Sequence, residues 1–346
     1  MEPSDRRLIL AGVGLAGVAA LSRLAKAGPL DPPPGPVEPT GRTLNDLYDK
    51  VARTDAGLAE PRIPVQSLPG SGTAVHVIDQ PGSYYLTGNV AGATGKHGIE
   101  IRSSDVTLDL AGFALQGRSD ALHGITAGGY SGIRVFNGDV GGWGGDGVQL
   151  GYGCLAESVR AASNGGYGIR IASGVVNGCS ARSNSLGGFS SAGASFVQCR
   201  AEGCGVGFFC SFGSALHSCV ADGNAAGYYV EQDSAVVACV ARNSTDQGYV
   251  VRTQARAINC ESYGHATGFL ISEGVCDGCH ASRGTSEGFY AGPGARALIT
   301  RCVASGNTTN FALSGGNSYG PIVDVAAAGD ISAIPNAGHP WANFAY

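Results

Sequence analysis

A glycine followed by an apolar residue recurs about every 20 residues over much of this 346-residue chain, and this period constrains the fold more than any other feature. Two longer units precede the regular ones, at Gly98 and Gly124. The regular lead positions are Gly147, Gly168, Gly188, Gly207, Gly227, Gly248, Gly268, Gly288 and Asn310. A fixed period of this length indicates a repeat architecture. We expect the column to mark a turn, because Asn is the residue that, after Gly, best tolerates a positive φ.

After each lead position the chain alternates with a period of two, which is typical of a strand. The next residue is apolar in every unit and is expected to point inward: Ile99, Ile125, Val148, Ile169, Phe189, Phe208, Tyr228, Tyr249, Phe269, Phe289 and Phe311. A second strand in each unit carries a cysteine followed two residues later by a small residue. Its cysteines are Cys179, Cys199, Cys219, Cys239, Cys260, Cys279 and Cys302.

Short strands at this spacing, with no helical segments between them, predict an all-β parallel β-solenoid of about eleven coils stacked about 4.8 Å apart. The leucine-rich repeat is the competing solenoid of similar period, but its leucine and asparagine consensus is missing. Residues 42–53 carry Leu44, Leu47 and Val51 on one helical face. We expect a short capping helix within residues 42–61, because an open solenoid end needs a cover.

Two segments carry a family resemblance. "PGSYYLTGNV" (residues 81–90) is similar to the first-coil entry, and "VTLDLAGFALQG" (residues 106–117) to the N-terminal coil signature, of right-handed parallel β-helix proteins of the pectate-lyase-like superfamily, especially exported bacterial members. The resemblance covers residues 62–325 and implies a right-handed parallel β-helix there. It implies no particular chemistry, because this fold carries lyases, hydrolases, adhesins and other functions.

The first 27 residues have the features of an export signal: Arg6 and Arg7, an apolar run over residues 8–21, and Ala25-Lys26-Ala27 as a cleavage site. The paired arginines favour the twin-arginine route, and an ordinary signal with two chance arginines is the alternative. A proline-rich linker follows over residues 28–41, and residues 326–346 form a C-terminal tail. We therefore expect a periplasmic, cell-surface or extracellular protein with no transmembrane segment after signal removal.

The net charge of −5 argues against nucleic acid as a partner, because duplex binding needs a basic face. Cys276-x-x-Cys279-His280 has the spacing of a haem c attachment site. In repeat register, however, both cysteines occupy columns that are apolar in neighbouring units. We expect no haem or other cofactor, no metal site, and buried free thiols rather than a disulfide framework.

The second residue after each lead position is expected to face outward, and this strip changes character along the chain. It carries Glu100, Thr126, Gln149, Arg170 and Ser190, and then Phe209, Tyr229, Val250, Leu270 and Tyr290. An exposed apolar row needs a cover. We expect the aromatic tail, through Trp341, Phe344 and Tyr346, to fold over it; a glycan or another subunit is the alternative.

A polar column is expected on the N-terminal coils, just before the lead glycines. His97, His123 and Asp146 would stack at coil spacing and could supply an acid and a base for catalysis. We assign them as candidate catalytic residues. The candidate substrate-binding residues are Glu100, Arg102, Trp143 (as a sugar-stacking ring), Arg170, Phe209, Tyr229 and Tyr290.

Two functions remain open on this evidence. The first is non-catalytic glycan binding, adhesion or a structural role at the cell envelope or outside the cell, with a polysaccharide or cell-surface partner. The alternative is a polysaccharide lyase or glycoside hydrolase that uses the polar column. The motifs of polygalacturonases and the clustered carboxylates of calcium-dependent pectate lyases are both missing, which favours the first.

Overall fold

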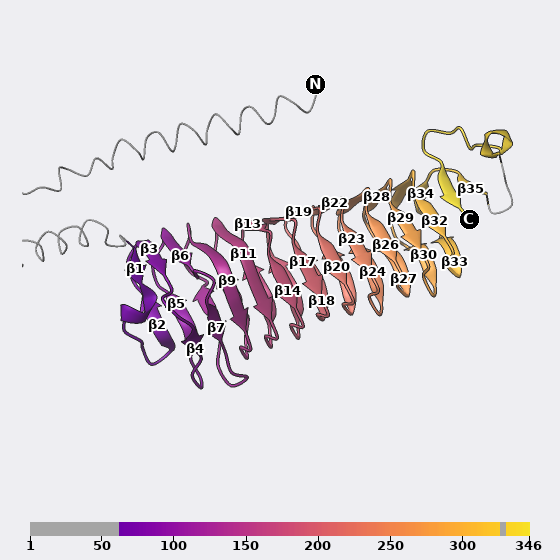
Figure 1. The fold of residues 1–346 in the computed structure, drawn as a ribbon. Coiled ribbons are helices and arrows are strands. Elements are labelled where there is room, and N and C mark those ends of the chain that lie inside the picture. The colour runs from indigo at the N-terminus through magenta and orange to yellow at the C-terminus, as the bar shows by residue number, and fades with distance from the viewer. Residues whose placement is uncertain (1–61, 326–329) are drawn as a thin grey trace, which may run out of the picture. The chain divides into compact units, whose positions relative to one another are not determined.

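The computed structural model describes residues 62–325 and 330–346, and these form a parallel β-solenoid whose coils follow one another in chain order (Figure 1). One face is a sheet of twelve parallel strands. These strands are β2 (Ala74–Ile78), β5 (His97–Ile101), β8 (Ile125–Ala127), β10 (Val148–Leu150), β12 (Tyr167–Ile171), β15 (Gly187–Ser191), β18 (Val206–Cys210), β21 (Ala226–Val230), β24 (Gln247–Val251), β27 (Thr267–Ile271), β30 (Glu287–Ala291) and β33 (Thr309–Leu313).

The rest of each coil belongs to a 24-stranded sheet made of two stacks. Two long strands, β9 (Arg134–Gly141) and β11 (Cys154–Ala162), run through both stacks and join them. The first stack also contains β1 (Ile63–Pro64), β3 (Gly82–Tyr85), β6 (Val106–Asp109), β13 (Gly174–Asn177), β16 (Ala194–Val197), β19 (Ala215–His217), β22 (Ala235–Val237), β25 (Arg256–Ile258), β28 (Val275–Asp277), β31 (Leu298–Thr300) and β34 (Ser318–Tyr319). The second contains β4 (Val90–Ala91), β7 (Ala114–Gln116), β14 (Ser180–Arg182), β17 (Arg200–Glu202), β20 (Val220–Asp222), β23 (Val240–Arg242), β26 (Glu261–Tyr263), β29 (His280–Ser282), β32 (Val303–Ser305), β35 (Ile322–Asp324) and β36 (Asn343–Ala345).

The predicted fold class is confirmed, with one strand more in the twelve-stranded sheet than the expected eleven coils. The extra strand is β2. The glycine pattern did not predict it, because Val75 occupies the position where later coils carry the lead glycine. Among the described residues there are two short 3-10 helices: η1 (Val65–Ser67), between β1 and β2, and η2 (Ile331–Ala333), between β35 and β36. The predicted export signal, linker and capping helix lie outside the described residues. Within the described ranges, no helix combines the length and the apolar character that a membrane crossing requires.

The lead glycines are not turn residues, so this part of the prediction is wrong. They lie inside the strands of the twelve-stranded sheet or, at Gly124 and Gly147, directly before them, and their φ angles are not positive. Space is what requires glycine there: a Cβ on Gly188 would lie 2.7 Å from the carbonyl oxygen of Gly207 and 2.8 Å from the Cβ of Ala201. The lead glycines and the inward alanines of the opposite stack therefore allow the two faces to approach closely.

The real corners are set by residues of several types that adopt a positive φ. One corner precedes each ladder cysteine, as at Gln198, Ser218 and Ala238, with φ of 52°, 53° and 51°. The other corner follows the inward alanine, as at Ser163 and Ser183. Non-glycine residues seldom adopt this conformation, so residue type alone does not mark these corners.

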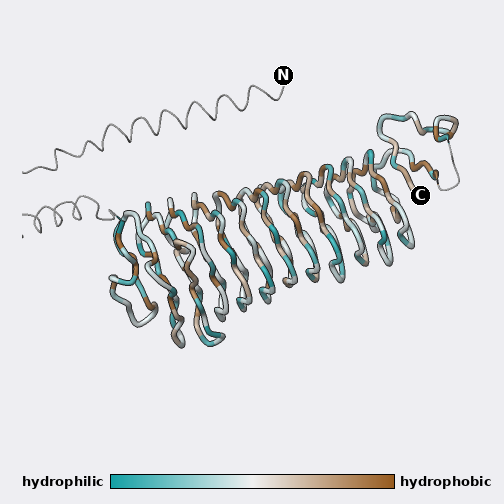
Figure 2. The backbone as a smooth tube through the Cα atoms, viewed as in Figure 1, coloured by the Kyte–Doolittle hydropathy of each residue, from teal (hydrophilic) through white to brown (hydrophobic). Residues whose placement is uncertain are grey.

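The inward column after the lead glycines forms the core, as predicted. From Phe189 onward its rings stack coil on coil, with centroids 4.6–5.1 Å apart. The tyrosines keep their hydroxyls satisfied inside this stack, since Tyr249 Oη donates to the carbonyl of Cys239 at 2.7 Å. Hydrophobic segments recur from one coil to the next along the solenoid (Figure 2). Burying a large side chain contributes about 1.5–3 kcal/mol, so the stack is a major source of stability.

All eleven cysteines are buried and free. Cys276 pairs in register with Ala257 and Ile299, which confirms that its column is apolar. The ladder thiols donate to nearby carbonyls: Cys199 Sγ lies 3.3 Å from the carbonyl oxygens of Val176 and Val197. Each thiol is thus a small core residue with a weak hydrogen bond.

The C-terminal tail does not cover the apolar strip, so that expectation is wrong. Strand β36 pairs with β32 and β35, placing Phe344 beside Val303 in the 24-stranded sheet. Asn343 is fully buried, and its Oδ1 accepts from the backbone N–H of Cys302 at 2.9 Å. The tail extends the last coils because β32 offers unpaired backbone groups at the end of the stack.

The thiols should resist modification in the folded protein, because burial raises the pKa of the Cys179 thiol to about 12 and the thiolate is the reactive form. We expect a thiol reagent at neutral pH to react with few cysteines in native protein, and with most of the eleven after denaturation without reductant. Recovery of fewer than half after denaturation would show that a disulfide framework exists instead.

Candidate functional site

The outward residues of the twelve-stranded sheet form one continuous row, which we call the outer row. Strand register places one residue from each coil in it: Val77, Glu100, Thr126, Gln149, Arg170, Ser190, Phe209, Tyr229, Val250, Leu270, Tyr290 and Ala312. The predicted change from polar to apolar residues therefore occurs along a single line. The strip is less exposed than expected, because Val250 is fully buried and the larger apolar side chains are half-buried.

A hollow of about 310 Å³ lies where the two halves of the outer row meet. Gln149, Arg170, Ser190 and Phe209 line it from four consecutive coils. From Phe209 onward the row is apolar, and its first two rings, Phe209 and Tyr229, are 6.2 Å apart. A concave site with an apolar wall and a few convergent polar groups is the usual form of a ligand site.

The structure brings His97, His123 and Asp146 together, one from each of three consecutive coils. Each side chain accepts a hydrogen bond from a backbone N–H of the next coil. His97 Nδ1 accepts from His123 N at 3.2 Å, and His123 Nδ1 accepts from Asp146 N at 2.8 Å. Asp146 Oδ1 accepts from Tyr167 N at 2.8 Å. The polar column is thus an acceptor ladder that satisfies backbone donors between coils.

This geometry decides the protonation of the two imidazoles, whose rings stack 5.3 Å apart. Burial is the largest cause that lowers the pKa of His97, with the neighbouring His123 second. Burial also lowers the pKa of His123, followed by an opposing effect of Asp146, which raises it. Both rings are therefore neutral near pH 7, and because each Nδ1 accepts a hydrogen bond, the proton is on Nε2. The catalytic role of these three residues stays a prediction.

Arg170 is positioned by the buried carboxylate of Asp146, which lies on the preceding coil. Its Nε lies 3.2 Å from Asp146 Oδ2, and Asp146 is only 1% exposed. The guanidinium carbon lies 5.0 Å from the ring centroid of Tyr167. A guanidinium fixed on one edge loses less conformational entropy when its other donors bind a ligand.

The other charged candidates, Glu100 and Arg102, bind each other at 2.7 Å. Both also hydrogen-bond the hydroxyl of Thr73. The hydrogen bond from Arg102 is the main cause that lowers the pKa of Glu100. Glu100 lies on β5 and Arg102 just after it, two coils before Gln149, and neither lines the hollow.

Trp143 is not available for sugar stacking, so its assignment is wrong. The ring is 1% exposed, and its Nε1 donates to the carbonyl of Leu115 at 3.3 Å. Glycines make the space for it: a Cβ on Gly98 would lie 2.7 Å from the ring, and a Cβ on Gly117 2.6 Å from it. The glycine-rich sequence around Trp143 therefore serves packing.

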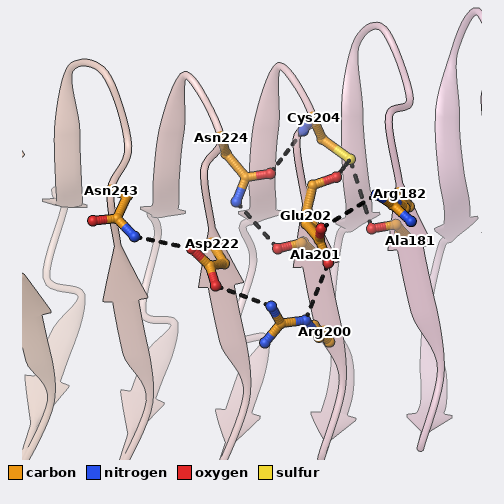
Figure 3. Close-up of polar contacts among 9 residues, drawn as sticks. All are labelled: Ala181, Arg182, Arg200, Ala201, Glu202, Cys204, Asp222, Asn224 and Asn243. Carbon is orange, nitrogen blue, oxygen red and sulfur yellow. Dashed lines mark hydrogen bonds and ion pairs between the residues drawn. The ribbon is translucent and has the colours of Figure 1, made fainter.

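A second ladder of buried polar residues escaped the sequence analysis. Trp143 N donates to Asn164 Oδ1 at 3.1 Å, and Asn164 N donates to Asn184 Oδ1 at 3.0 Å. Figure 3 shows the continuation, where Asn224 accepts from the backbone N–H of Cys204. The signal that could have revealed it is an asparagine three or four residues before several lead positions: Asn164, Asn184, Asn224 and Asn307.

Ion pairs lie on the outward side of the second stack, on strands such as β17 and β20 (Figure 3). Arg200 Nη2 lies 2.9 Å from Asp222, and its Nε lies 3.5 Å from Glu202. Exposed pairs of this kind contribute little stability. In these pairs the charge of Arg200 is matched by Glu202 and Asp222, so we assign no ligand-binding role to them.

Comparisons with known proteins add little to this site. No family model matches the chain, and no curated protein matches it. Among solved structures, pectate lyase Pel9A aligns with a TM-score of 0.35 and 14% identity over 73% of this chain and 72% of that protein. The parallel β-helix thus rests on this structure itself.

Folded-state stability should fall as the pH is lowered from about 7 to about 5, because His97, His123 and His265 have lowered pKa values and the unfolded chain binds protons there that the folded protein does not. Urea unfolding at several pH values measures this. His265 belongs to the asparagine column, where its Nδ1 accepts from Ser244 N at 3.0 Å. We expect His265→Asn to reduce the pH dependence, and an unchanged pH profile would contradict this account.

The packing of Trp143 can be tested at the glycines. Gly117→Ala should lower the free energy of unfolding by about 1–3 kcal/mol, because the new methyl group would overlap the ring. Gly129→Ala is the matched control, since a Cβ there meets nothing within 4 Å. Equal unfolding midpoints for the two variants would mean that Trp143 moves aside at no cost.

Proposed function

We propose that this protein is a non-catalytic glycan-binding β-helix protein that holds an extended polysaccharide along the outer row. The observation that carries the proposal is the hollow at Gln149, Arg170, Ser190 and Phe209, which continues through Tyr229 into the apolar half of the row. A row that repeats once per coil suits a linear polymer of repeated units.

The chemistry of the row also suits sugars. A pyranose ring has C–H groups on its faces and hydroxyls at its edges. Phe209 and Tyr229 offer flat apolar surfaces for the faces, whereas Gln149 and Ser190 offer hydrogen-bonding groups for the edges. Arg170 adds donors whose position is already set by Asp146, and such preorganisation lowers the cost of binding.

The predicted export signal supports a site of action at the cell envelope or outside the cell, where polysaccharides occur. The alternative, a lyase or hydrolase acting through His97, His123 and Asp146, has weaker support. The two Nδ1 atoms and Asp146 Oδ1 already accept hydrogen bonds from the backbone. Asp146 Oδ2 accepts no hydrogen bond, but it is buried and lies 3.2 Å from Arg170 Nε. A general base needs a free acceptor within reach of the substrate.

Affinity electrophoresis against a panel of soluble polysaccharides tests the proposal. We expect at least one polysaccharide to retard the mature protein. The double variant Phe209→Ala, Tyr229→Ala should weaken this binding at least about tenfold, because central aromatic residues dominate binding energy. The control is Tyr263→Ala, an exposed aromatic residue on β26 of the other sheet.

Two outcomes would overturn the proposal: no retardation by any polysaccharide, or equal retardation of the double variant and the unchanged protein. The same samples are assayed for new reducing ends. Cleavage that disappears in His123→Ala would establish the enzymatic alternative instead.

A further inference from the structure

A groove of about 580 Å³ lies near the C-terminal end of the solenoid, on the outward side of the 24-stranded sheet. Its floor comes from β28, β31 and β34, and one wall comes from the tail. The lining residues are Val275, Asp277, Leu298, Thr300, Ser318, Tyr319, Gly320, Pro321, His339 and Trp341. The volume falls within the range of small-molecule sites, about 300–1,000 Å³.

Hydrogen bonds hold the C-terminal segment that forms this wall against the last coils. Asn343 Nδ2 donates to the carbonyls of Gly320 at 3.0 Å and Ile299 at 3.2 Å. Gly320 is needed for this approach, since a Cβ there would lie 1.6 Å from the carbonyl oxygen of Trp341. These contacts fix the backbone beside Trp341. This residue remains 52% exposed, and the guanidinium carbon of Arg301 lies 5.9 Å from its ring centroid.

The polar groups of the groove are few and already oriented. The carboxylate of Asp277 accepts from Thr300 Oγ1 at 2.9 Å and from Arg301 Nε at 2.7 Å, and also pairs with Arg301 Nη2. The hydrogen bond from Arg301 is the main cause that lowers the Asp277 pKa. His339 Nδ1 accepts from Trp341 N at 3.2 Å, which leaves Nε2 as the ring nitrogen that can donate.

We propose that this groove binds a single pyranose sugar ring, with one face of the sugar against Trp341 and its hydroxyls hydrogen-bonded to Asp277 and His339. Arg301 already balances the charge of Asp277, so the site does not call for an organic cation. The same carboxylate disfavours an anion. A purely apolar ligand would cover the Nε2 donor of His339 without satisfying it. The ligand should therefore be uncharged and should carry hydrogen-bonding groups. A pyranose has both properties, with apolar faces and hydroxyls at its edges.

This site is independent of the outer row, because it lies on the other sheet and shares no residue with it. Its failure would leave the proposed polysaccharide binding untouched. The two tryptophans of the chain allow it to be observed separately. Trp143 is 1% exposed and Trp341 is 52% exposed, so iodide quenching of fluorescence reports on Trp341.

The experiment titrates the full protein with the methyl pyranosides of glucose, galactose, mannose and N-acetylglucosamine. We expect at least one to protect Trp341 from iodide with a Kd on the order of 1 mM, the range open to a ligand of about a dozen non-hydrogen atoms. Saturation-transfer NMR follows the same sugar without relying on tryptophan. In that measurement Trp341→Ala and Asp277→Asn should each weaken binding at least about tenfold.

Tyr152→Ala is the matched control, because Tyr152 is 67% exposed and does not line the groove. The double variant Phe209→Ala, Tyr229→Ala should also keep the binding, which separates this site from the outer row. Absence of binding by all four sugars would overturn the proposal, and so would equal binding by Trp341→Ala and the unchanged protein.

Discussion

Backbone hydrogen bonding between successive coils is the interaction on which the rest of this structure depends. Apart from those at the ends of each stack, the described strands pair in parallel with the equivalent strands of the coils before and after them, so most residues lie between their own counterparts. Parallel pairing at about 4.8 Å brings side chains of one column into direct contact. A residue that suits one coil is therefore repeated in the next, which explains the stacked rings of Phe208, Tyr228 and Tyr249.

The same constraint creates a demand for acceptors at the corners. Where the chain turns out of a strand, a backbone N–H loses its strand partner, and an unpaired buried donor is costly. Two sets of side chains meet this demand: the asparagines that begin at Asn164, and the column of His97, His123 and Asp146. A stack of imidazoles and a carboxylate can thus arise from structural need, although it has the composition of a catalytic site.

Both proposed binding sites lie at outward positions that the stacking leaves free to vary. The outer row combines the polar side chains of early coils with the apolar ones of later coils. The groove arises where the repeat ends and the tail supplies Trp341. The buried columns fix the scaffold in both cases, so changes at Phe209 or Trp341 can alter binding with little effect on the fold.

The sequence by itself determined the solenoid, the inward aromatic and cysteine columns, and the outward row from Glu100 to Tyr290. These follow from alternation and period, which depend only on neighbours along the chain and on equal coil lengths. The tertiary structure decided what those positions contact. Corners at Gln198 and Ala238 carry no residue signature. The asparagines do recur before several lead positions, but their spacing does not show that they, or the histidine Nδ1 atoms, accept hydrogen bonds from the backbone of a neighbouring coil. Trp143 is buried because glycines from other coils leave room for it, and β36 pairs with β32 some 40 residues earlier. Contacts between distant coils depend on the path of the backbone in space, which residue type and local spacing do not specify.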